Sequence, residues 1–321
     1  MKILKSVAAA LLCVVLVSLV SCSGNAPAPE TEAEIHVHSY TVTAVTFDED
    51  NTDYREGERP YLVDMEFELR CECGDSLPID AAEVICTDAE IARGDTELHF
   101  SYTSDDGTEY GGVFAVNTKP VYKVVFAGDS ITEGGSGSGQ VPYTMYVKKK
   151  LRHNVSVTNC GISGISVTGY GGIWNDPLYS YKNQNVWNDV VGSKADLIFV
   201  MLGTNDAEDW TNAEPSFDAD FEELVASFAD TGANVVVLPP PPSIDGNAFG
   251  VENTLLEEEI VPREKAIAEK LGVGFFDTYA LLKESFPEGS YSDGLHFSDN
   301  GKKYFAGIIA EKIREMYGIE E

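Results

Sequence analysis

The hydrophobic pattern of the chain changes its period near Val121, and this change limits the possible folds more than any other feature. Before it, segments such as "SYTVTAVTF" and "TELHFSYT" alternate apolar and polar residues, which is typical of half-exposed strands. After it, apolar runs such as "YKVVFAG" and "ADLIFVMLG" are separated by helical patterns. Strands that are apolar on both faces and alternate with helices form a parallel sheet covered on both sides. The pattern therefore predicts a small all-β sandwich over 36–120 and an α/β unit over 121–321.

Within the α/β unit, the spacing of apolar residues places each expected element. We expect helices over 143–151, 217–228, 253–271 and 300–317, and strands over 122–128, 155–161, 195–203, 234–240 and 273–278. In such a sheet, a ligand lies outside the carboxyl ends of the strands.

The first 35 residues are predicted to be a targeting segment and a tether. Lys2 and Lys5 precede an apolar run over 7–20 that is too short to span a bilayer. The run ends in "LVSC", which resembles the lipobox of bacterial lipoproteins and would leave a lipid on Cys22. An ordinary secretory signal is the alternative. We therefore expect residues 1–22 to be removed, a Pro/Ala/Glu-rich tether over 23–35, and an extracytoplasmic lipoprotein at the cell membrane.

The charge of the chain excludes one class of partner. Its 321 residues include 22 Lys and Arg against 53 Asp and Glu, a formal net charge of −31. Binding to nucleic acid needs clustered cations that contact phosphates. We therefore expect no nucleic-acid partner.

Two pairs of possible metal ligands lie in the predicted β unit. His36 and His38 stand two apart, as do Cys71 and Cys73, so each pair would share one face of a strand. Four such side chains could form a zinc site, but the usual cysteine pairs are separated by two to four residues. A disulfide from Cys86 to Cys71 or Cys73 is a further possibility. We assign no metal or cofactor, and both possibilities stay open.

Four short polar stretches follow predicted strands or precede the last helix. They are "GDS" at 128–130, "NCGISG" at 159–164, "GTND" at 203–206 and "SDGLHFSDNG" at 292–301. The first three follow parallel strands, so we expect them to meet at one edge of the sheet, where the fourth can reach them.

These stretches carry the groups of a nucleophilic site. The hydroxyl of Ser130 needs an adjacent base, and His296 is the histidine placed to supply it. Asp293, three residues earlier, can fix the tautomer of the imidazole. The backbone N–H groups of Ser130 and Gly164 and the side-chain amide of Asn205 are candidate donors to an oxyanion. The pattern predicts a Ser/His/Asp hydrolase.

Residues 121–321 resemble the SGNH, or GDSL-type, hydrolases. The four blocks of that family correspond to "GDSITEG", "NCGISG", "GTND" and "DGLH" in chain order. The resemblance implies a three-layer α/β/α fold and metal-free ester hydrolysis by Ser130, Asp293 and His296, with Gly164 and Asn205 in the oxyanion hole. One departure is Phe297, where many members have proline. The β unit resembles bacterial immunoglobulin-like modules.

A secreted, tethered esterase with a β module resembles the surface enzymes that remove acetyl groups from plant or host polysaccharides, so this resemblance implies an O-acetyl group on a poly- or oligosaccharide as the substrate. Trp174, Asp209 and Trp210 lie in or near loops that could approach the site, and indole rings stack on sugars. The alternatives are a lysophospholipase or thioesterase of the same family, and a non-catalytic glycan-binding surface protein.

Overall fold

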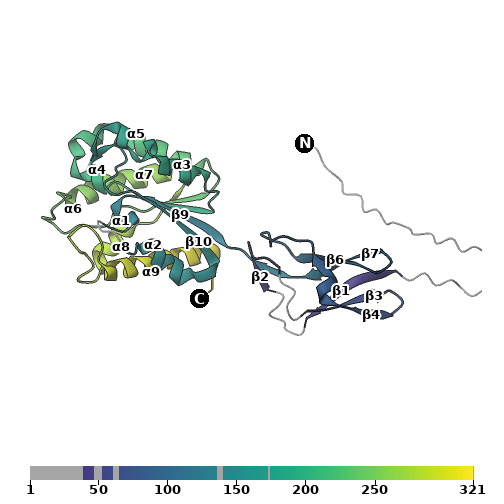
Figure 1. The fold of residues 1–321 in the computed structure, drawn as a ribbon. Helices are drawn as coiled ribbons and strands as arrows, with labels where there is room; N and C mark the ends of the chain where they lie inside the picture. Colours follow the sequence, from purple (N-terminus) through teal and green to yellow (C-terminus); the bar gives the residue numbers. More distant parts are fainter. Residues whose placement is uncertain (1–38, 47–52, 61–64, 136–139, 173, 321) are drawn as a thin grey trace, which may run out of the picture.

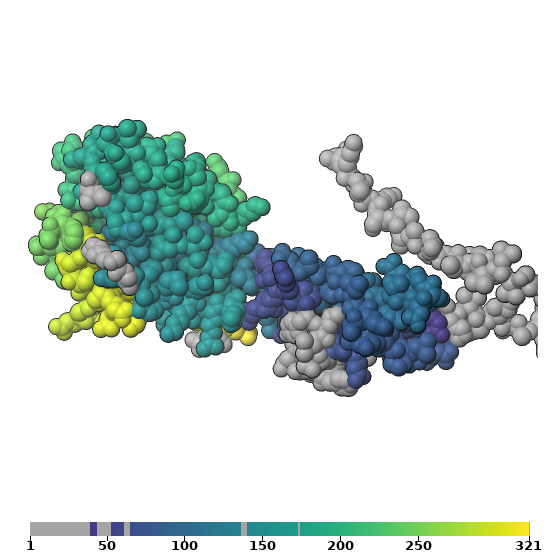
Figure 2. Space-filling model, in the orientation of Figure 1, coloured from purple at the N-terminus to yellow at the C-terminus, as the bar shows by residue number. Residues whose placement is uncertain are grey.

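The computed structural model describes residues 39–46, 53–60, 65–135, 140–172 and 174–320. Figure 1 and Figure 2 show two lobes that meet at a narrow contact, an N-terminal β unit and a C-terminal α/β unit. The predicted signal segment with Cys22, the tether, His36 and His38 lie outside the described residues. Within the described ranges, no helix is long and apolar enough to cross a membrane.

The β unit is built from two antiparallel three-stranded sheets and one short parallel pair. Their orders are β1-β3-β4, β5-β6-β7 and β2-β8. Side chains of both three-stranded sheets, among them Phe67 and Phe100, belong to one hydrophobic core. This agrees with the predicted all-β unit. The strands are β1 (Tyr40–Thr46), β2 (Asp53–Arg55), β3 (Met65–Cys71), β4 (Ser76–Ile79), β5 (Val84–Cys86), β6 (Glu97–Thr103), β7 (Glu109–Ala115) and β8 (Asn117–Lys119).

The expectation that Cys71 and Cys73 share one face of a strand is wrong. Cys71 is buried at the end of β3, whereas Cys73 is exposed in the turn that leads to β4. The turn starts earlier than the pattern suggested, because the N–H of Gly74 is already bonded to the carbonyl of Cys71. Cys86 is a free thiol, so the structure does not contain the possible disulfide to either residue.

The α/β unit is centred on a five-stranded parallel sheet in the order β10-β9-β13-β14-β15. Its strands are β9 (Tyr122–Gly128), β10 (Val155–Gly161), β13 (Leu197–Met201), β14 (Asn234–Val237) and β15 (Gly274–Phe275). One face is covered by α3 (Asn185–Gly192), α5 (Trp210–Ala229) and α7 (Val261–Leu271), and the other by α2 (Tyr143–Leu151), α8 (Thr278–Ser285) and α9 (Asp299–Tyr317) (Figure 1).

The two faces of the sheet bury separate cores because successive strand residues point to opposite sides. Val125 and Ala127 pack with the side chains of α3, α5 and α7. Val124 and Phe126 pack with those of α2, α8 and α9. The predicted three-layer α/β/α fold is confirmed.

The remaining elements of the unit are short. They are α1 (Ser130–Glu133), η3 (Arg152–Asn154), the hairpin β11 (Tyr170–Gly171) and β12 (Trp174–Asn175), η4 (Pro177–Tyr179), η5 (Tyr181–Asn183), α4 (Thr204–Glu208), α6 (Asn253–Leu255) and the π-helical turn η6 (Leu256–Ile260). The expected helix over 253–271 is thus continuous through α6, η6 and α7.

Helix α5 begins seven residues before the predicted start at Phe217. Pro215 lies inside the helix, where it removes one backbone hydrogen bond. The extra turns are held by side-chain contacts, one within the helix and one to α7. The ring of Trp210 packs edge-on against Phe217 at 5.3 Å, and the guanidinium of Arg263 lies 5.3 Å from the indole.

The β unit joins the α/β unit at the amino ends of its strands (Figure 1). Asp196 lies directly before β13, and its carboxylate oxygens lie 2.6 and 3.0 Å from the guanidinium of Arg93. Arg93 also bonds Glu56 at 2.8 Å and lies over the ring of Tyr122 at the start of β9. The carboxyl ends of the strands therefore point away from the β unit.

Candidate active site

The register of the sheet brings three of the four polar stretches together. Gly128 at the end of β9 pairs with Gly161 of β10 on one side and Met201 of β13 on the other. Ser130 follows this row by two residues, and Gly164 and Asn205 by three and four. All three therefore leave the sheet at the same edge.

The strand-to-helix turn at Ser130 depends on the missing side chain of Gly128. A Cβ at this position would lie 2.2 Å from the hydroxyl of Thr132 and 2.8 Å from the carbonyl of Met201. Asp129 then caps α1, because its Oδ1 accepts the N–H of Ile131 at 2.8 Å. Ser130 is the first residue of α1, and only 8% of its surface is exposed. The turn holds the hydroxyl at the edge of the sheet.

The loop between α8 and α9 brings the imidazole of His296 to this hydroxyl. The Oγ of Ser130 lies 2.8 Å from Nε2 of His296, although the two residues are 166 positions apart. On the other side of the ring, Nδ1 lies 2.8 Å from Oδ2 of Asp293. The structure thus places the three predicted residues in one hydrogen-bonded chain.

Asp293 also shapes the backbone that carries His296. Its Oδ1 accepts the N–H groups of Leu295 at 3.0 Å and of His296 at 2.7 Å. Partial burial raises the pKa of Asp293, but the hydrogen bonds from the backbone and ring of His296 and from Leu295 outweigh it and hold the pKa below its usual value. The carboxylate is therefore ionised wherever an imidazole acts as a base.

The departure at Phe297 gives the loop an aromatic anchor. Its buried ring packs against Phe286 at 5.0 Å and Phe305 at 5.3 Å, in the core beneath α9. The edge of Phe249 contacts the ring of His296, with centroids 5.1 Å apart. Ser298, which follows Phe297, caps α9. Packing and the helix cap thus hold the loop in place around His296 without a proline.

The candidate oxyanion donors lie beside one another. Among the described residues, the structure gives no acceptor for the N–H groups of Ser130 and Gly164. Asn205 uses one amide hydrogen to bond the carbonyl of Ile165 at 2.7 Å, which leaves the other hydrogen for a ligand. Because Ile165 follows Gly164, this bond ties the two predicted positions together.

Two glycines pack closely against these donors, and the sequence analysis did not single them out. A Cβ on Gly171 would lie 1.8 Å from the carbonyl oxygen of Asn205, and one on Gly172 would lie 2.4 Å from that of Gly164. Both residues have positive φ, at +85° and +67°. The only signal in the sequence was the motif "GYGG", which is equally typical of an ordinary turn.

Lys302 is a second group that the pattern did not predict. It is buried on α9, where its Nζ donates to the carbonyl of Gly134 and to Oε1 of Gln140. Burial lowers its pKa. Lys302 therefore fastens the segment that follows α1 to the helix that follows His296.

Buried carboxyl groups lie below the site. The carboxylate of Asp206 accepts the N–H groups of Val167 and Thr168 at 2.9 and 3.0 Å, and burial raises its pKa to about 6. Burial also raises the pKa of Asp129 to about 6 and that of Glu264 well above its ordinary value. Among the described residues, neither carboxylate oxygen of Glu264 has a hydrogen-bond partner.

The two tryptophans named from the sequence lie in different surroundings. Trp210 is half-buried against Phe217 and does not line the hollow described next. Trp174 and Asp209 line a hollow of about 280 Å³ beside Gly172.

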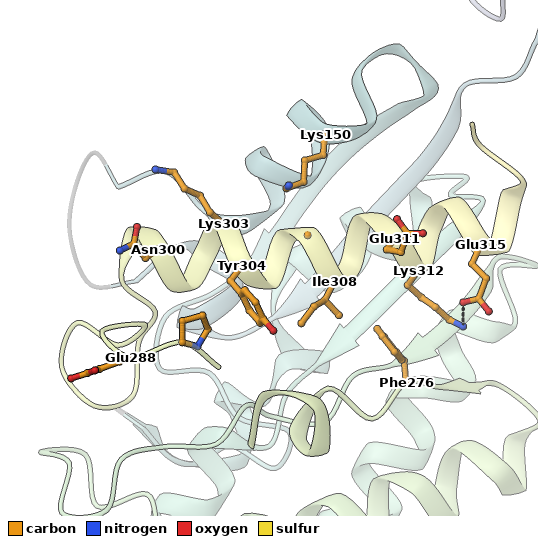
Figure 3. Close-up of a pocket in the computed structure, with 12 residues that line it drawn as sticks. Lys150, Phe276, Glu288, Asn300, Lys303, Tyr304, Ile308, Glu311, Lys312 and Glu315 are labelled. Carbon is orange, nitrogen blue, oxygen red and sulfur yellow. Dashed lines mark hydrogen bonds and ion pairs between the residues drawn. The ribbon is translucent and has the colours of Figure 1, made fainter. Parts of the chain in front are cut away.

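A larger groove, of about 830 Å³, runs along the outer side of α9 (Figure 3). Phe276, Tyr304 and Ile308 supply apolar side chains to it, and charged residues such as Lys303 and Glu311 flank them. Neither Ser130 nor His296 belongs to its lining.

The predicted possibility of a metal site receives no support from the part of the chain that the structure describes. There, no three His, Cys, Asp or Glu side chains gather closely enough to hold an ion. The two histidines of the proposed zinc set lie outside the described residues.

Comparisons with known proteins identify relatives of the α/β unit. The model of the GDSL-like Lipase/Acylhydrolase family matches residues 126–304, which is more than half of the chain. An acetylxylan esterase from Xylanibacter ruminicola is 24% identical over 215 residues, which cover 60% of this chain and 43% of that protein. The chain thus spans less than half the length of this relative.

Among solved structures, a lipase/acylhydrolase from Enterococcus faecalis superimposes with a TM-score of 0.51 and 22% identity. The match covers 63% of this chain and all of the other. It supports the fold of the α/β unit. An acetyl xylan esterase from Geobacillus stearothermophilus gives a TM-score of 0.45 at 23% identity, over 62% of this chain and 96% of the other, which is too loose to bear on function.

Proposed function

The chain belongs to the GDSL-like Lipase/Acylhydrolase family, and from that premise we propose that it is a serine esterase that removes O-acetyl groups from carbohydrates. The observation that carries the esterase proposal is the hydrogen-bonded chain from Ser130 through His296 to Asp293 at the carboxyl ends of the sheet. In this proposal Ser130 is the nucleophile, His296 the general base and Asp293 the group that orients the imidazole.

The reaction passes through an acyl-serine intermediate. His296 takes the proton of Ser130 as Oγ attacks the carbonyl carbon of the ester, and the alcohol leaves with that proton. Water then attacks the acyl-enzyme by the same route and releases the acid. The hydrogen bond from Nδ1 to Asp293 leaves Nε2 as the acceptor that faces Ser130.

The negative charge of the tetrahedral intermediate is held by Gly164, Asn205 and the N–H of Ser130. Two of these donors are backbone N–H groups on rigid turns, and the third is fixed by its bond to Ile165. Donors that are already in place need no reorganisation during the reaction. Gly171 and Gly172 support the arrangement by allowing the neighbouring hairpin to press against it.

Acetylated saccharide is the proposed substrate class. The support comes from the related protein named as an acetylxylan esterase and from the exposed indole of Trp174 beside the site. Two carboxylates, Glu208 and Asp209, line the same hollow and would repel an anionic headgroup.

We also propose that the mature protein is anchored outside the cytoplasm by a lipid on Cys22. The support is the "LVSC" motif after a short apolar run, followed by a polar tether. Replacement of Cys22 by alanine should release the protein from the membrane fraction of its host. Retention of the Cys22→Ala variant in that fraction would contradict the anchor.

The first experiment compares a soluble form beginning near His36 with its Ser130→Ala variant on p-nitrophenyl acetate, butyrate and octanoate. Turnover of acetate that is lost with Ser130 and falls towards octanoate is the expected result. A preference for octanoate would favour the lysophospholipase or thioesterase alternative. If none of the three esters and no acetylated xylan is hydrolysed, the chain is a binding protein.

A further inference from the structure

A small hollow adjoins the proposed oxyanion hole on the side of the hairpin β11–β12. Its lining consists of Gly171, Gly172, Trp174, Asn175, Glu208 and Asp209, and its volume is about 280 Å³. Gly172 connects it to the reacting centre, because a Cβ there would contact the carbonyl of Gly164 and lie 3.0 Å from Oδ1 of Asn205. A molecule that fills the hollow would therefore lie directly beside the bound ester.

Trp174 forms one wall of the hollow and belongs to an exposed aromatic pair. The indole of Trp174 stacks on the ring of Tyr179 with centroids 4.2 Å apart and planes 11° from parallel. The two residues are 37% and 40% exposed, and Leu178 between them in the chain is 71% exposed. A stacked aromatic pair that keeps more than a third of its surface exposed is the kind of contiguous apolar surface that marks interaction sites. Such a flat face suits the C–H face of a sugar ring.

The other wall offers hydrogen-bond acceptors. Oε2 of Glu208 accepts the N–H of Gly172 at 2.8 Å, which fixes this carboxylate against the hairpin. The carboxylate of Asp209 bonds the amide of Asn212 at 2.9 Å, which fixes it in turn. Ionised carboxylates accept hydrogen bonds and donate none, and hydroxyl groups can supply the matching donors. Their charge disfavours a phosphate or a uronic acid.

We propose that this hollow is a saccharide subsite that holds a neutral sugar residue next to the acetylated one. It rests on the proposed function, and it assigns the ring contact to Trp174 and the hydroxyl contacts to Asp209 and Glu208. The site distinguishes an acetylated oligosaccharide from a small acetate ester by contacts beyond the acyl group. Its effect falls on the binding of the saccharide, so KM changes more than kcat.

The test measures kcat and KM of the wild-type protein and three variants on acetylated xylo-oligosaccharide and on p-nitrophenyl acetate. Trp174→Ala should lose at least about tenfold more kcat/KM on the oligosaccharide than on the small ester, chiefly through KM. Trp174→Phe, which keeps a flat ring, should recover part of the loss. Leu178→Ala removes an exposed apolar side chain of the same segment outside the hollow and should match the wild type on both substrates.

Equal losses of Trp174→Ala on both substrates would show a structural role and overturn the proposal. So would an unchanged KM for the oligosaccharide. A second measurement separates this failure from failure of the proposed function. Binding of acetylated xylo-oligosaccharide to Ser130→Ala is measured by calorimetry, with and without Trp174→Ala. If the added substitution weakens binding tenfold although the wild type releases no acetate, the subsite stands and the esterase proposal falls. If it leaves binding unchanged, the subsite is overturned.

Discussion

Asp293 holds His296 at two points, because one carboxylate oxygen accepts its backbone N–H at 2.7 Å and the other lies 2.8 Å from its Nδ1. The same side chain thus fixes both the position of the backbone and the orientation of the ring. A substitution of Asp293 can therefore disturb the orientation of the ring and leave the position of the backbone unchanged.

Asp293→Asn should therefore keep the loop and lose the tautomer. One oxygen remains to accept the backbone N–H, but an amide group facing Nδ1 would turn the imidazole into the wrong hydrogen-bonding form. We expect kcat for p-nitrophenyl acetate to fall by up to about 10⁴-fold, with little change in Tm. Near-normal turnover would remove Asp293 from the proposed triad.

Asn205→Ala tests the oxyanion donor. The change removes the free amide hydrogen, and kcat should fall by about 10²–10³-fold, equivalent to roughly 3 kcal/mol. It also breaks the bond to the carbonyl of Ile165, so the Tm of the variant must be measured beside its kinetics. A fall in kcat that disappears at lower temperature would indicate lost stability instead of a lost donor.

Phe297→Ala tests the aromatic anchor of the histidine loop. The ring is fully buried among Phe286 and Phe305, and its removal should cost about 3–5 kcal/mol of the free energy of unfolding. Because the ring follows His296 directly, kcat should fall as well. Phe297→Leu should recover most of the stability, and equal stabilities of the alanine variant and the wild type in urea would contradict the role.

The local sequence predicted the sheet and the residues that meet at its edge, because the ends of the strands are marked by short-range patterns. Strands β9 and β10 end where the apolar run ends, and the parallel topology then fixes where Ser130 and Gly164 emerge. The roles of Gly171 and Lys302 depend on contacts with segments more than 30 residues away, and no local pattern carries that information.

Two expectations that the structure corrects, the strand at Cys73 and the start of helix α5, have similar causes. Alternation suggested that the strand continues to Cys73, but hydrogen bonds close the turn after Cys71. The predicted helix began only at Phe217, but α5 begins at Trp210, whose ring contacts Phe217 and Arg263. In both cases hydrogen bonding or packing outweighed the local preference of the chain.

Glu264 was also missed, although its spacing carried a signal. It lies four residues after Ile260 and three before Ile267, so it shares the buried face of its helix. A glutamate in such a pattern is usually read as a surface residue. Its burial leads to a prediction about pH.

Glu264→Gln should stabilise the protein at neutral pH. Burial raises the pKa of Glu264 above the ordinary value of 4.5, and the nearby carboxylates of Asp206 and Asp129 raise it further. A carboxyl whose folded-state pKa is raised contributes its full stability below the unfolded-state pKa. That contribution is lost as the pH rises through the folded-state pKa. Glutamine carries no charge, so the variant should gain about 1–3 kcal/mol over the wild type at pH 8.

The measurement is the Tm of both proteins by calorimetry between pH 4.5 and pH 8. The difference should be smallest at pH 4.5, where the glutamate is protonated in the folded state and half protonated in the unfolded state, and it should grow as the pH rises. Glu269→Gln, at an exposed position of the same helix, is the matched control and should follow the wild type. A gain that is the same at every pH would mean that the stabilisation comes from packing, and that the pKa of Glu264 in the fold is not raised above its value in the unfolded chain.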